Sequence, residues 1–147
     1  MKNTEVLNDL ILINNDRIEG YNKAAKDAKD ESLRSLFTDM AQQSATMVNE
    51  LKQEVKLGED DADDGTTLKG KIYRTWMDIK VAFGGDSRKA LLESCEFGED
   101  AAQRAYEAAL DEPALSIDVR NVIQKQQMEL KHAHDKIKSM RDAAQPA

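Results

Sequence analysis

Apolar side chains recur every three or four residues along four long stretches of this chain, the spacing of one face of an α-helix. The pattern predicts helices over about residues 4–28, 33–56, 88–110 and 117–141. Short polar turns at residues 29–32 and 111–114 separate the first helix from the second and the third from the fourth. Helices joined by so few residues pack as antiparallel neighbours. The chain is therefore predicted to contain two helical hairpins.

The two predicted hairpins repeat one pattern with an offset of 85 residues, so that Tyr21 matches Tyr106 and Asn14 matches Glu99. A hairpin with one apolar face cannot bury that face alone, and two of them pack together as a four-helix bundle. On the first predicted helix the inward face comprises Leu7, Leu10, Ile11, Asn14, Ile18, Tyr21, Ala25 and Ala28. The methionines expected to fill the core are Met40, Met47, Met128 and Met140.

Residues 57–87 form a connection that is too long for a turn. It opens with an acidic run at residues 59–64 and continues as an amphipathic segment that ends at Gly84 and Gly85, which predicts a short extra helix. A crossover of this kind gives an up-down-down-up order of helices. The predicted fold is therefore all-α, a single domain over residues 1–147 with a hairpin at 4–56, a crossover at 57–87 and a hairpin at 88–142.

Three segments carry a family resemblance: LNDLILINNDRIEGYNKAA, RTWMDIKVAF and SCEFGEDAAQRAYEAAL. From about residue 4 to residue 141 the chain resembles a bacterial family of ferritin-like four-helix-bundle proteins of unknown function. The resemblance implies a ferritin-like fold and brings no established activity. A role in stress or stationary-phase physiology would suit it. Members of the wider ferritin-like group often hold two metal ions at the centre of the bundle.

Polar residues interrupt the apolar faces at similar depth in all four predicted helices. Buried amides and hydroxyls can donate hydrogen bonds to a carboxylate, and such a layer fixes helix register at some cost in stability. Tyr21 and Tyr106 lie one or two turns away and are near enough to add their hydroxyls. If the layer is only structural, Glu99→Gln is expected to leave folding intact or to improve it. The predicted layer consists of Asn14, Gln43, Ser44, Glu99 and Gln126.

The alternative is a metal centre around Glu99. A di-iron bundle needs one Glu from each of two helices and a Glu-x-x-His motif from each of the other two. This chain offers one such motif, Glu129 to His132, and helical spacing turns both side chains away from the centre. Asn14 stands where a second central carboxylate is needed. The metal hypothesis, with iron or another divalent ion, therefore rests on four residues: Glu96, Glu99, Glu129 and His132.

Composition narrows the classes of function. A net charge of −7 disfavours nucleic acid and anionic membrane as partners, because both require clustered positive charge. A single cysteine cannot form an internal disulfide, and the first residues contain no long apolar run. We therefore expect a cytoplasmic protein.

The predicted crossover helix has a basic face with one tryptophan. This face is either exposed to solvent or a docking surface for an acidic partner or a second subunit. The chain has no glycine-rich phosphate loop, no Cys-x-x-Cys pair and no plausible Ser/His/Asp set. We expect a non-catalytic structural or protein-interaction module with no cofactor, acting as a homo-oligomer or with an unknown protein partner. The candidate interaction residues are Lys69, Lys71, Arg74, Trp76 and Lys80.

Overall fold

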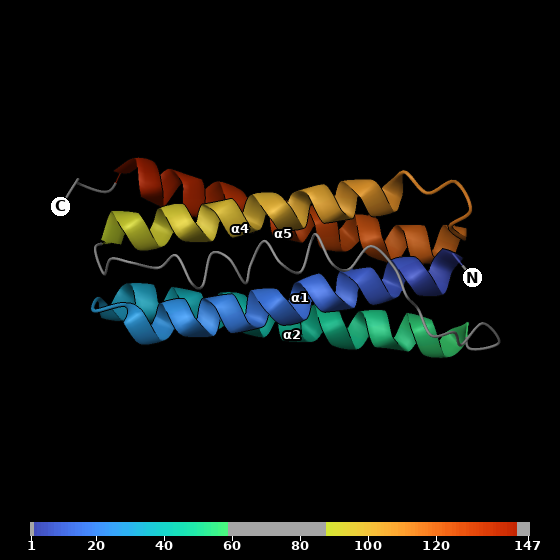
Figure 1. The fold of residues 1–147 in the computed structure, drawn as a ribbon, viewed down its shortest axis with the longest axis horizontal. Helices are drawn as coiled ribbons and strands as arrows, with labels where there is room; N and C mark the ends of the chain where they lie inside the picture. The colour runs from blue at the N-terminus through green and yellow to red at the C-terminus, as the bar shows by residue number, and fades with distance from the viewer. Residues whose placement is uncertain (1, 59–87, 144–147) are drawn as a thin grey trace.

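A computed structural model describes residues 2–58 and 88–143 of the chain. It has four long helices, α1 (Lys2–Asp27), α2 (Glu31–Leu57), α4 (Arg88–Leu110) and α5 (Ile117–Ala143), drawn in Figure 1. No strand occurs in these two ranges. The all-α class and the four long helices predicted from the periodicity are thus confirmed, with helix ends that fall within a few residues of the expected positions.

The helices associate as two hairpins, with α1 packed along α2 and α4 along α5, and the hairpins meet mainly through α1 and α4. At one end of the bundle, Asn3 Oδ1 accepts a hydrogen bond from the Ser116 N–H in the α4–α5 turn (3.2 Å). At the other end, Arg88 forms an ion pair with Asp30 in the α1–α2 turn. The helices α1 and α5 accordingly run in one direction, and α2 and α4 in the other (Figure 1).

Several features predicted for the crossover lie outside the described residues. These are the acidic run at 59–64, the short extra helix, and the basic face with Lys69, Lys71, Arg74, Trp76 and Lys80. None of the described helices is long and apolar enough to cross a membrane.

In both hairpin turns an arginine side chain donates hydrogen bonds to backbone carbonyls where the preceding helix ends. The periodicity did not predict these contacts. In the first turn of α2, Arg34 donates to the carbonyl oxygens of Ala25 and Ala28 at the end of α1 (3.3 and 2.7 Å). Near the start of α5, Arg120 donates in the same way to the carbonyls of Leu110 and Glu112 (2.7 and 2.9 Å). The last carbonyls of a helix have no hydrogen-bond donor within the helix. Each arginine therefore supplies donors to carbonyls that would otherwise lack them.

The core follows the four predicted apolar faces. Tyr21 and Phe37 lie at its centre with their ring centroids 5.7 Å apart, and both side chains are fully buried. One predicted core residue is wrong: Met128 is 63% exposed, and its side chain lines a surface groove instead of the core. Other large buried side chains include Leu7, Leu10, Ile13, Leu33, Met47, Leu51, Leu91, Leu92, Ile123, Leu130 and Ile137.

The stability of the bundle should depend on this core and little on its exposed apolar residues. Leu51 is fully buried, so Leu51→Ala leaves a cavity and should lower the free energy of unfolding by about 2–5 kcal/mol. Leu57, on the same helix, is 81% exposed, and Leu57→Ala should change it by no more than about 0.5 kcal/mol. Urea unfolding followed by circular dichroism measures both. Equal losses for the two variants would contradict the placement of α2.

Candidate functional site

A buried ion pair lies at the centre of the bundle. Arg17 of α1 and Glu99 of α4 are both fully buried. The guanidinium donates twice to Glu99 Oε2, from Nε at 3.1 Å and from Nη2 at 2.7 Å. The other carboxylate oxygen, Oε1, is buried and accepts no hydrogen bond from the described residues. The pair joins the two hairpins, because its members come from different ones.

The rest of the Arg17 guanidinium is directed toward α2. Its Nη1 donates to Ser44 Oγ at 2.7 Å and to the Met40 carbonyl at 3.2 Å. Its central carbon lies 5.0 Å from the centre of the Tyr21 ring, within the range of a cation–π contact. A buried charge is tolerated when its donors are satisfied and a counter-charge lies beside it, and Arg17 meets both conditions.

Two tyrosines link the hairpins reciprocally. Tyr21 on α1 donates its hydroxyl proton to Glu99 Oε2 on α4. On the matching positions of the repeat, Asn14 on α1 donates through Nδ2 to the Tyr106 hydroxyl on α4 at 2.8 Å. Each central polar residue is thus held by the tyrosine of the opposite hairpin. The 85-residue offset of the sequence reappears as a pair of cross-hairpin contacts.

The network continues from the centre to the surface through α5. Ser44 donates to Asn14 Oδ1 at 2.8 Å, which connects the ion pair to Tyr106. The Tyr106 hydroxyl donates to Gln126 Oε1 at 2.6 Å, and Gln126 Nε2 donates to Glu50 Oε1 at 2.8 Å. Glu50 is partly exposed on α2. Side chains of all four described helices therefore belong to one connected network.

The electrostatic environment keeps the neighbours of Glu99 protonated. Burial, followed by the charge of Glu99, raises the pKa of Tyr21 well above its usual value, so the phenol remains a donor. Burial and the same charge raise the pKa of the Cys95 thiol, and burial raises that of Tyr106. For Arg17, burial alone would lower the pKa, but the Glu99 carboxylate reverses this and the net shift is upward. A protonated thiol and a protonated phenol are poor nucleophiles.

The structure brings together four of the five residues of the predicted polar layer. Asn14, Ser44, Glu99 and Gln126 are all buried members of the network, linked through residues that the prediction did not assign to it. Gln43 is only half-buried at the flank of α2, and its Oε1 accepts no hydrogen bond from the described residues.

Arg17 is the main residue that the sequence analysis missed. It lies three residues after Asn14 and four before Tyr21, which is the spacing of the inward face. The spacing alone could therefore have found it. The sequence analysis assigned no position to Arg17 and expected no cation opposite Glu99.

The four residues of the metal hypothesis do not form a common site. Glu96 of α4 forms an ion pair with Arg141 of α5 at 2.7 Å. Glu129 lies 12 residues before Arg141 on α5, which places it about 18 Å from Arg141 along the helix axis. Glu129 is 44% exposed and pairs with Lys125 at 3.9 Å, and His132 is exposed. Glu99 is engaged by Arg17. Among the described residues these four side chains are therefore not brought together as one set of ligands, and Glu96 is instead grouped with Asp100 and His134.

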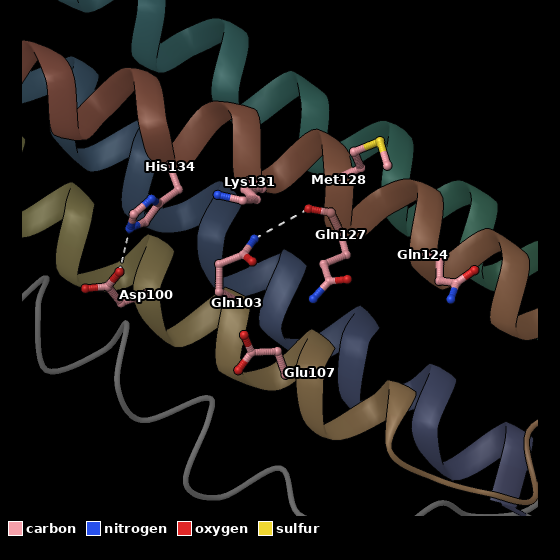
Figure 2. A pocket seen from close by; sticks show the side chains of 8 residues that line it. All are labelled: Asp100, Gln103, Glu107, Gln124, Gln127, Met128, Lys131 and His134. Atoms are coloured by element: carbon pink, nitrogen blue, oxygen red, sulfur yellow. Dashed lines mark hydrogen bonds and ion pairs between the residues drawn. The ribbon is translucent and has the colours of Figure 1, made fainter.

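A different set of metal-binding residue types meets at the edge between α4 and α5. We refer to Glu96, Asp100 and His134 as the edge cluster; one possible ligand atom from each lies within 4.8 Å of the others. His134 Nε2 lies 2.6 Å from Asp100 Oδ1, and the two side chains border a groove of about 750 Å³. Figure 2 shows the groove, lined by α4 and α5. Burial would lower the pKa of His134, but its hydrogen bonds to Asp135 and Asp100 give a net rise.

The fold and the network define an all-α four-helix bundle with a buried polar network at its centre. The model of the family described as a domain of unknown function (DUF2383) matches residues 2–112, and the chain belongs to that family. The match spans α1, α2 and α4, and so includes Arg17 and Glu99, whereas α5 lies beyond it. No curated protein matches the chain.

The buried guanidinium reverses the expectation for Glu99→Gln. An amide cannot neutralise Arg17, so this variant should lower the free energy of unfolding by about 3–5 kcal/mol. Arg17→Met should also destabilise, because it leaves the Glu99 carboxylate without its counter-charge. Arg17→Met combined with Glu99→Gln removes both charges and should lose less than the sum of the single changes, with a coupling of about 1–3 kcal/mol.

Urea unfolding of the four proteins in this cycle measures the coupling. Gln43→Leu is the matched control, since Gln43 lies near the same depth outside the network, and it should shift stability by no more than about 0.5 kcal/mol. Additive losses in the cycle would show that Arg17 and Glu99 do not interact.

Proposed function

We propose that this protein is a non-catalytic structural module that acts through contacts with other protein chains, and that its fold is of the ferritin-like, up-down-down-up kind. The observation that carries the proposal is the Arg17–Glu99 pair. In a metal-carrying bundle the central carboxylates bind cations from solution. Here a cation supplied by the chain itself is bound to the central carboxylate.

The chemistry of the centre supports a structural role in three ways. Glu99 Oε2 already accepts from Arg17 and from Tyr21, which leaves little room on that oxygen for a metal ion. Within the described residues, no group of three possible metal ligands includes Glu99. The tyrosines and the thiol nearby have raised pKa values and are held protonated. A network of this kind fixes how the two hairpins pair, which is a structural task.

The directions of the helices support the ferritin-like assignment. The end of α2 and the start of α4 lie at opposite ends of the bundle, so α2 and α4 run in the same direction, as the up-down-down-up order requires (Figure 1). The cytoplasmic location rests on the single buried cysteine and the net negative charge. Possible partners are a second copy of the chain or another protein, and a role in stress physiology is part of the same proposal.

Iron loading tests the non-metal centre. The experiment uses the His134→Gln protein, in which the edge cluster has lost its imidazole. This protein is exposed anaerobically to ferrous iron, desalted and analysed by elemental mass spectrometry. Because Arg17 already neutralises Glu99, we expect only trace iron, unchanged when Glu99→Gln is added. One or two ions per chain that disappear with Glu99→Gln would overturn the proposal in favour of a metal-carrying bundle.

Photo-crosslinking in cells tests the interaction role. Met128 is exposed and lines the groove between α4 and α5, so a partner bound in this groove would contact it. A photoreactive residue at Met128 should give a discrete protein adduct. The same residue at Asn49, an exposed polar position on α2, should give only background. No adduct from Met128 above the Asn49 background would count against a partner on this face.

A further inference from the structure

The geometry points to a divalent-cation site at the edge cluster, where Glu96 and Asp100 of α4 and His134 of α5 supply the ligands. The proposal is independent of the function proposed for the bundle centre, because the two places share no residue. A cation at the edge cluster would connect α4 to α5 within one hairpin, whereas the Arg17–Glu99 pair connects the two hairpins.

The backbone brings the three ligands together. Glu96 and Asp100 are four residues apart on α4 and therefore project from the same face of that helix. His134 reaches them from the facing helix, and one ligand atom from each residue lies within 4.8 Å of the other two. Two ligand atoms that each lie about 2.0–2.2 Å from one ion are at most about 4.4 Å apart. Side-chain rotations that bring the three atoms within this limit would place an ion between them.

The ligand types define the class of cation. Two carboxylates and one imidazole suit zinc, manganese or ferrous iron and lack the thiolates that select copper(I). The side chains of Glu96 and His134 are mostly buried, at 12% and 18% exposure, whereas Asp100 is 42% exposed and borders the groove. Three protein ligands leave coordination positions for water, and the groove beside Asp100 gives solvent access to them (Figure 2).

A further carboxylate orients the imidazole. His134 Nδ1 lies 3.2 Å from Asp135 Oδ1, on the side of the ring away from Asp100. An Nδ1–H that donates to a carboxylate leaves the Nε2 lone pair free for a metal, an arrangement common around histidine ligands. A hydrogen bond from Nδ1–H to Asp135 would hold the tautomer that the site requires.

One carboxylate of the cluster is already paired with a cation of the chain. Arg141 pairs with Glu96 at 2.7 Å and also with Asp142 at 2.6 Å. The Arg141 side chain is 29% exposed and has a second carboxylate partner in Asp142. A divalent cation that binds Glu96 therefore has to displace the Arg141 contact.

Cobalt(II) titration of the full chain tests the site, since its visible absorption reports the ligand set, and zinc competition gives the affinity. One ion per chain is expected. His134→Gln and Asp100→Asn should each weaken binding at least about tenfold, and Asp135→Asn by about tenfold. Arg141→Gln should tighten binding, because it removes the competing cation; a merely non-specific acidic surface would not single out these positions.

Two neighbours serve as matched controls. His132→Gln and Glu129→Gln alter exposed residues of the same helix, and both should leave cobalt affinity unchanged. Glu99→Gln should also leave it unchanged in protein that is folded by circular dichroism. No cobalt spectrum at millimolar ion would overturn the site, as would binding that survives both His134→Gln and Asp100→Asn. Binding lost only in Glu99→Gln would place the metal at the bundle centre instead.

Discussion

The bundle depends on two opposite charges that are both removed from water. Burying a guanidinium or a carboxylate alone is costly, and Arg17 and Glu99 each supply the counter-charge that the other needs in the core. We infer that the pair contributes less to net stability than to the alignment of the two hairpins. Any shift of α1 along α4 by one helical turn would separate the charges and leave both exposed to an apolar surrounding. The ion pair therefore fixes how the two hairpins are aligned, and the apolar core supplies most of the stability.

The repeat in the sequence is used asymmetrically. Asn14 and Glu99 occupy equivalent places and are held by tyrosines of the opposite hairpin, yet one is neutral and the other charged. At the position equivalent to Arg17 the second hairpin has Ala102, a small buried residue. One half supplies the long cationic side chain and the other supplies its counter-charge. The asymmetry distinguishes this pairing of hairpins from a symmetric alternative.

Much of the fold was predictable from the sequence, because helical periodicity and short turns are local properties. The depth of Asn14 and Glu99 in the core followed from the same periodicity. The partner of Glu99 did not follow from the periodicity, because it depends on which helices meet across the bundle. A charged residue on an apolar face, such as Arg17, is hard to assign to the core until its counter-charge is known. The edge cluster was missed for a related reason: His134 lies 34 residues from Asp100, and only the packing of α4 against α5 brings them together.

Nitrogen-15 NMR of the arginine side chains tests the central claim most directly, because it observes the Arg17 guanidinium in the intact protein. If Arg17 is buried against Glu99, its Nε–H should give a sharp, shifted resonance that exchanges with water far more slowly than that of Arg104, which is exposed on α4. The resonance should move when Glu99 is changed to Gln. An Arg17 Nε–H that exchanges as fast as that of Arg104 would contradict the account.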